Sequence, residues 1–120
     1  MVELKEPRGD ILACRIDGAI ERQDLNRVFA KIDRKTANGA RLRVYAEIGD
    51  LSLMNLIGLS QDLKSWKDRR HLVNQIDKAA VVSDNAYIRQ VLQFAKVPAS
   101  LEIRLFSMGE RTAARKWIEA

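Results

Sequence analysis

The sequence predicts an α/β protein, in which one domain holds a mixed, mostly parallel sheet flanked by helices. The spacing of apolar residues switches repeatedly between a period of about two, typical of strands, and about 3.6, typical of helices. The 120 residues suffice for one compact domain, and we treat residues 1–120 as that domain. A composition of 47% hydrophobic and 31% charged residues is typical of a globular protein and argues against general disorder.

The chain begins with a predicted β-hairpin followed by a helix. Val2 and Leu4 alternate with charged residues, residues 7–10 (Pro-Arg-Gly-Asp) indicate a turn, and residues 11–16 form the next apolar run. Asn38-Gly39 then predicts the end of the first helix. The residues expected on its buried face recur at helical spacing: Leu25, Val28, Phe29, Ile32 and Thr36.

The middle of the chain predicts strand, helix and strand. Apolar and polar residues alternate over residues 42–48, and a helix is expected from about 55 to 71. Residues 76–82 contain the short apolar run Ala-Ala-Val-Val, which is typical of a central strand covered on both faces.

The last third predicts a helix, a strand and a final helix. Ser83 or Asp84 is expected to cap the third helix, and residues 101–106 alternate as a strand. Ser107 and Glu110 have the spacing of a capping box, which opens the last helix. Its inward face is expected to carry Ala113, Ala114, Trp117 and Ile118. The predicted order is ββαβαβαβα, with the first strand as an antiparallel edge.

Four segments in this order resemble the SpoIIAA-like proteins, bacterial relatives of the STAS domain. They are residues 18–25 (Gly-Ala-Ile-Glu-Arg-Gln-Asp-Leu), 62–64 (Asp-Leu-Lys), 79–84 (Ala-Ala-Val-Val-Ser-Asp) and the stretch from Phe106 through Ala113-Ala114-Arg115-Lys116-Trp117-Ile118. The resemblance implies a mixed sheet flanked by helices, and docking of proteins or small ligands instead of catalysis. It also implies a comparison with lipid-binding CRAL-TRIO domains, by analogy only.

The same resemblance draws attention to residues 49–55. The better-known anti-sigma-factor antagonists carry Asp-Ser-Ser/Thr-Gly at the start of the second helix, where a partner kinase phosphorylates a serine. Here the stretch reads Gly-Asp-Leu-Ser-Leu-Met-Asn, so Ser52 lies near the corresponding place but the motif is absent. The sequence therefore gives no support for a phosphoserine switch.

Catalytic and metal chemistry lack their usual residues. The single histidine, His71, follows Arg69 and Arg70 at the expected end of a helix, where positive charge offsets the helix dipole. The single cysteine, Cys14, lies in an apolar run and is expected to be a buried structural thiol. We therefore expect no enzyme activity, no catalytic residue, no metal and no cofactor.

Candidate contact residues gather after the parallel strands, at the sheet edge where open α/β sheets bind ligands. The loop and first turns of the second helix are more apolar than one sheet-covering face requires. The expected contact residues are Glu47, Asp50, Leu51, Ser52, Met54, Ile57, Ser83 and Asp84. Ordinary structural roles remain open for three of them: Glu47 as a solvent-facing strand residue, Asp50 in a turn and Asp84 as a helix cap.

Three functions remain open at this point. The first is a non-enzymatic binding or regulatory module that docks a protein and forms a homodimer. The second is a carrier of a small apolar or lipid-like ligand in a pocket beside the second helix. The third is a basic nucleic-acid accessory protein, which the net charge of +5 allows. Acidic residues among the basic ones of both helices make this function less favoured. The N-terminus shows no signal region and no segment is apolar enough to span a bilayer, so the cytoplasm is the expected location.

Overall fold

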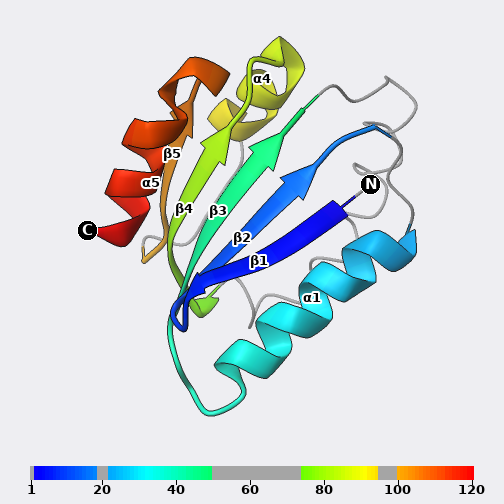
Figure 1. The fold of residues 1–120 in the computed structure, drawn as a ribbon, viewed down its shortest axis with the longest axis vertical. Coiled ribbons are helices and arrows are strands. Elements are labelled where there is room, and N and C mark those ends of the chain that lie inside the picture. Colours follow the sequence, from blue (N-terminus) through cyan, green and yellow to red (C-terminus); the bar gives the residue numbers. More distant parts are fainter. Residues whose placement is uncertain (1, 19–21, 50–73, 95–99) are drawn as a thin grey trace.

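The computed structural model describes residues 2–18, 22–49, 74–94 and 100–120 (Figure 1). The elements are β1 (Val2–Arg8), β2 (Ile11–Ile16), α1 (Arg22–Thr36), β3 (Leu42–Ile48), β4 (Ile76–Val82), α4 (Ala86–Phe94), β5 (Glu102–Phe106), the 3₁₀ helix η2 (Met108–Glu110) and α5 (Arg111–Glu119). They confirm the predicted α/β class. The helix expected over 55–71 lies outside the described residues.

The strands form one five-stranded sheet in the order β1-β2-β3-β4-β5. β1 runs antiparallel to β2, and the other three pairs are parallel, as the sequence predicts. The four parallel strands therefore end at the same edge, which we call the carboxyl edge.

The hairpin differs from its prediction at Pro7 and Arg8. Both residues belong to β1, and the turn consists of Gly9 and Asp10 alone. The register between β1 and β2 shifts between Lys5 and Arg8, which accommodates a proline that cannot donate a ladder hydrogen bond. Half of the predicted turn, Pro7 and Arg8, therefore belongs to an edge strand.

Helices cover both faces of the sheet, with α5 beside β4 and β5 and α1 near β1 (Figure 1). Successive residues of a strand point to opposite faces, and Ile11 and Leu12 illustrate this. Ile11 belongs to the core cluster that contains Ala114 and Ile118 of α5. Leu12 belongs to the cluster formed with α1. We call these two sides the α5 face and the α1 face.

The first helix has the predicted buried stripe. Phe29, Ile32 and Thr36 are buried, and the Thr36 hydroxyl donates a hydrogen bond of 2.8 Å to the Ile32 carbonyl oxygen. Gly39 has a φ of +80°, a conformation that a side chain disfavours, and its N–H donates to the Thr36 carbonyl oxygen. The predicted helix stop is thereby confirmed.

The last helix begins through the predicted capping box. The Ser107 N–H donates to Glu110 Oε1 at 2.9 Å, and a single 3₁₀ turn precedes α5. Ala114 and Ile118 are buried as expected, but Ala113 is exposed. The stripe that meets the sheet is centred on Ala114 and Ile118, which leaves Ala113 at its margin.

Candidate functional site

Five of the expected contact residues lie outside the described residues. They are Asp50, Leu51, Ser52, Met54 and Ile57. The other three are described, and the structure does not bring them together. Ser83 and Asp84 follow β4 at the carboxyl edge, whereas the Glu47 side chain lies on the α5 face.

Ser83 and Asp84 connect the loops after β4 and β5. The Ser83 N–H donates to the Phe106 carbonyl oxygen at 2.9 Å, and the serine is fully buried. The Met108 N–H donates to Asp84 Oδ1 at 2.9 Å. Asp84 therefore supports the turn that opens η2.

Neither of these residues caps α4, which corrects the prediction. Asn85 Oδ1 accepts a hydrogen bond of 3.4 Å from the Ile88 N–H, the usual bond of an N-cap residue. Ser83 Oγ instead accepts from the Asn85 N–H at 3.1 Å and fixes the approach to the helix. Three adjacent polar residues follow β4, and propensity alone does not decide which of them caps the helix.

The loops after β2 and β3 also lie close together. The Gly49 N–H donates to the Ile16 carbonyl oxygen at 2.8 Å. A Cβ atom at position 49 would lie 2.8 Å from Asp17 Oδ1, so the glycine permits this close approach. At the carboxyl edge the described loops are thus joined in two pairs, β2 with β3 and β4 with β5.

Glu47 is buried, which overturns its interpretation as a solvent-facing strand residue. Only 7% of the residue is exposed, because it lies with Tyr45 on the face that α5 covers. The Tyr45 hydroxyl donates to Glu47 Oε1 at 3.2 Å. Arg15 Nε lies 3.6 Å from Glu47 Oε2, and Arg111 Nε lies 3.5 Å from Oε1. A buried carboxylate is therefore placed between arginines of β2 and α5.

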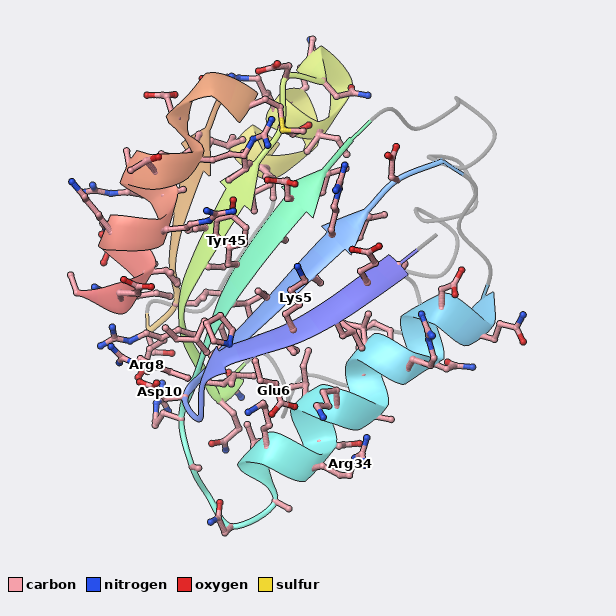
Figure 2. All side chains as sticks on the ribbon, in the orientation of Figure 1. Lys5, Glu6, Arg8, Asp10, Arg34 and Tyr45 are labelled. Atoms are coloured by element: carbon pink, nitrogen blue, oxygen red, sulfur yellow. The ribbon has the colours of Figure 1, made fainter. Side chains whose placement is uncertain are left out.

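Beside this carboxylate lies a groove of about 380 Å³, which we call the hairpin groove. It runs between the β1–β2 hairpin and α5, since α5 packs on β3, β4 and β5. Lys5 of β1 and Tyr45 of β3 both lie on this side of the sheet (Figure 2). The floor is apolar and consists mainly of Ile11, Ala13 and Ile118.

The charged residues of the hairpin groove come from three strands and α5. The basic ones are Lys5, Arg15, Arg111 and Arg115, and the acidic ones are Glu3, Glu47 and Glu119. Only Glu47 among them is a contact residue predicted from the sequence. The alternation of Glu3, Lys5 and Arg15 with apolar residues indicates a polar strand face, but only the position of α5 turns that face into a groove.

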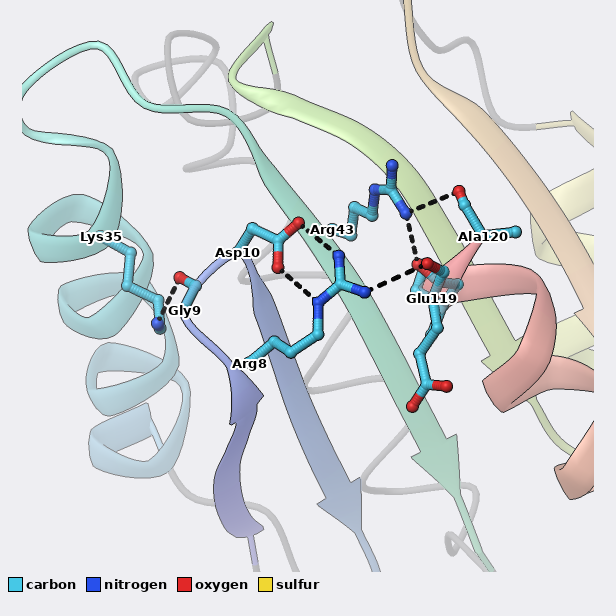
Figure 3. A network of polar contacts seen from close by, with 8 residues as sticks. Arg8, Gly9, Asp10, Lys35, Arg43, Glu119 and Ala120 are labelled. Atoms are coloured by element: carbon cyan, nitrogen blue, oxygen red, sulfur yellow. Dashed lines mark hydrogen bonds and ion pairs between the residues drawn. The ribbon is translucent and has the colours of Figure 1, made fainter.

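Polar contacts hold α5 at the side of the hairpin groove (Figure 3). Arg43 Nη1 donates to the carbonyl oxygens of Ile118 at 2.9 Å and of Ala120 at 3.0 Å. Arg8 Nη1 donates to the Glu119 carbonyl oxygen at 3.2 Å. Positive groups thus bind carbonyl oxygens that the helix end leaves without intrahelical partners.

The basic face of α1 is largely used to hold β1. Lys31 forms an ion pair with Glu6, which points toward the helix (Figure 2), and Lys35 Nζ lies 3.4 Å from the same carboxylate. Hydrogen bonding by Lys31 is the largest cause of a lowered pKa at Glu6. Arg27 donates to the Val2 carbonyl oxygen at 2.8 Å. These contacts leave less of α1's positive charge for a nucleic acid.

The described thiol and phenol are unsuited to act as nucleophiles. Burial raises the pKa of the Cys14 thiol to about 12, so the reactive thiolate is scarce near neutral pH. Burial, followed by the charge of Glu47, raises the pKa of the Tyr45 hydroxyl. Within the four described ranges, no three histidine, cysteine or acidic side chains are grouped so as to hold a metal ion. No helix in those ranges is long and apolar enough to cross a bilayer.

The fold and its groove define a small single-domain α/β protein with a mixed five-stranded sheet between helices. The chain belongs to the SpoIIAA-like family, whose sequence profile matches residues 11–119. This match confirms the resemblance found in the sequence. No curated protein sequence matches the chain.

Two solved structures share this fold. The anti-sigma factor antagonist SpoIIAA in its unphosphorylated form is similar with a TM-score of 0.58 and 14% identity, over 98% of each chain. The Bacillus cell fate determinant SpoIIAA in its phosphorylated form is similar with a TM-score of 0.52 and 15% identity, over 97% of this chain and 99% of that one. At these identities the likeness concerns the fold alone.

Proposed function

We propose that this protein is a cytoplasmic, non-enzymatic regulatory module that docks a protein partner at the carboxyl edge of its sheet. Leu51, Met54 and Ile57 would supply the apolar contact, and Asp50 and Ser52 polar contacts. The same surface would join two copies into a homodimer, since a self-complementary patch most simply forms a two-fold dimer.

The joined loops of the carboxyl edge are the observation that carries this proposal. The hydrogen bonds from Gly49 to Ile16 and from Met108 to Asp84 fix the described part of the edge before any partner arrives. A preformed surface loses less conformational entropy on binding than a flexible one. Asp84 and Ser83 would act as supports for this surface, because their polar groups already bind neighbouring loops.

Two further observations support docking over catalysis. The thiol of Cys14 and the hydroxyl of Tyr45 both have raised pKa values that keep them protonated. The chain belongs to the SpoIIAA-like family, and one solved structure of its fold is that of an anti-sigma factor antagonist, a protein that acts on another protein.

Charge substitution in the apolar segment tests the proposal. Analytical ultracentrifugation should give a dimer for the wild type and a folded monomer for Met54→Glu and Ile57→Glu, because a carboxylate cannot be buried without a partner. Ala30→Glu is the matched control, since it adds the same charge at an exposed position of α1. A wild-type monomer would refute self-association.

A photo-crosslinking side chain at position 54 tests the partner. It should capture one protein in cells, and the purified pair should bind with an affinity that Met54→Glu lowers and Ala30→Glu leaves unchanged. Equal affinities for all three forms would refute docking through this segment.

The alternative function, a carrier with an apolar pocket beside the second helix, makes a different prediction. Native mass spectrometry would then show a small molecule that co-purifies with the wild type and is lost from Ile57→Glu. A bare protein mass would count against it.

A further inference from the structure

We infer that the hairpin groove binds a small organic anion whose short apolar body lies on the groove floor. This site is on the α5 face of the sheet, so it is separate from the docking surface proposed at the carboxyl edge. Three features of the groove support such a site: its arginines, its charge balance and its size.

Glu47 lies beside two arginines whose outer donors are available. Arg15 and Arg111 approach its carboxylate from β2 and from α5, at 3.6 and 3.5 Å. Their side chains are nevertheless 59% and 51% exposed, so much of each guanidinium faces the groove and solvent. A guanidinium carries five N–H donors in a planar arrangement that fits a carboxylate or phosphate. Both guanidinium groups thus lie beside Glu47, and Arg111 Nε is further held by the Met108 carbonyl oxygen at 3.0 Å, which leaves outer donors for a further anion.

The remaining charges also favour an anion. The lining holds four basic and three acidic side chains, and Glu47 is already contacted by two of the basic ones. Lys5 forms no ion pair with any described residue, and Arg115 lies over the Tyr45 ring with its Cζ 5.9 Å from the centroid.

The size and floor of the groove define the rest of the ligand. Small-molecule sites begin at roughly 300 Å³, so a groove of about 380 Å³ accommodates only a small molecule. The half-buried Ala13 offers a small apolar surface, beside Ile11 and Ile118, which are almost fully buried. The fitting class is therefore a short-chain or aromatic carboxylate, sulfonate or phosphate monoester, with its charged group toward the arginines.

The probe for the test is 1-anilinonaphthalene-8-sulfonate, which joins an aromatic body to a sulfonate and fluoresces when its surroundings become apolar. The wild type should bind it saturably at one site. Arg115→Ala should weaken binding about tenfold, as expected for one lost charge-assisted contact. Ala13→Leu should abolish binding, because the larger side chain fills the floor.

Lys116→Ala is the matched control. It removes the same charge from the neighbouring position of α5, and Lys116 does not line the groove. Its affinity should stay within about twofold of the wild type, which shows that net charge alone does not decide binding. Far-ultraviolet circular dichroism and urea unfolding of each variant exclude a partly unfolded state that binds the dye nonspecifically.

Competition identifies the chemical class. Hexanoate should displace the dye while hexanol, which has the same chain length and no charge, should not. Hexyl phosphate, with the same chain length, separates a preference for phosphate from one for carboxylate. Equal dye binding by wild type, Arg115→Ala and Ala13→Leu, or equal displacement by hexanol, would overturn the inference.

The groove site and the docking surface can fail separately. Met54→Glu should leave dye binding unchanged, and Arg115→Ala should leave the dimer intact. A loss of dye binding in Met54→Glu would place the dye at the carboxyl edge and would refute the groove as its site.

Discussion

Replacing Arg43 with alanine should loosen α5 and destabilise the whole domain. Arg43 makes two hydrogen bonds to the helix end, one partly buried to Ile118 and one exposed to Ala120. A hydrogen bond to a charged group contributes roughly 1.5–3 kcal/mol when protected from water and less when exposed. A positive charge at a helix C-terminus adds roughly 0.3–1 kcal/mol. We therefore expect Arg43→Ala to lower the free energy of unfolding by about 2 kcal/mol, toward the lower limit of these contributions.

Urea unfolding followed by circular dichroism measures this change. With a slope of roughly 2 kcal/mol per molar urea, the midpoint should fall by about 1 M. Hydrogen exchange should also quicken in α5 before it quickens in α1, since the lost bonds hold only the last helix.

Two control variants sharpen the result. Arg104→Ala removes the same group from an exposed position of β5, where the guanidinium pairs with Glu102 at 3.8 Å and lies 5.2 Å from the centre of the Trp117 ring. These exposed contacts are weak, so the midpoint should change by no more than about 0.5 M. Arg43→Lys keeps the charge but loses the planar group, and should recover part of the stability. If Arg43→Ala behaves like Arg104→Ala, the hydrogen bonds to α5 do not stabilise the domain as argued.

Three further predictions concern the fold. Ile11→Ala should lower the free energy of unfolding by about 3 kcal/mol in urea titrations, because Ile11 is 1% exposed in the α5-face cluster; a loss below about 1 kcal/mol would contradict this packing. A new Cβ meets nothing within 4 Å at either Gly39 or Gly9, but only Gly39 has a positive φ, of +80°. Gly39→Ala should therefore cost about 1 kcal/mol and Gly9→Ala far less, and equal thermal midpoints would refute the contrast. The Glu110 carboxylate accepts hydrogen bonds from Ser107, which lowers its pKa below the usual 4.5, so its stabilising contribution is complete above that pH and is lost as pH falls through the lowered pKa. An NMR titration should give a pKa for Glu110 below the usual 4.5, and a value at or above 4.5 would contradict the hydrogen bond from the Ser107 N–H.

The sequence predicted helices and strands well where neighbouring residues determine the backbone conformation. The apolar run of residues 11–16 forms β2 with the same bounds, and the capping box of Ser107 and Glu110 opens the last helical segment. Gly39 ends the first helix as its conformational freedom predicts. These are short-range effects, and the sequence contains all the residues that produce them.

Tertiary placement explains what the sequence could not show. Alternation places Tyr45 and Glu47 on one face of β3 and Val44 on the other, but it does not say which face a helix will cover. Glu47 becomes buried because α5, far along the chain, packs over that face. The hairpin groove has the same origin, since it depends on how far α5 extends toward β1.

The contact between the first hairpin and the last helix bears on how the protein is made. Arg8 and Glu119 meet although 111 positions separate them, and Ile11 shares its cluster with Ile118. While α5 is being translated, it lies inside the ribosome's exit tunnel. Until α5 emerges, the side of the hairpin that carries Ile11 has no cover, and chaperones that recognise apolar nascent segments have time to bind it. The slow step of folding should then be the late closure of this very long loop, a search that begins only after α5 has left the tunnel.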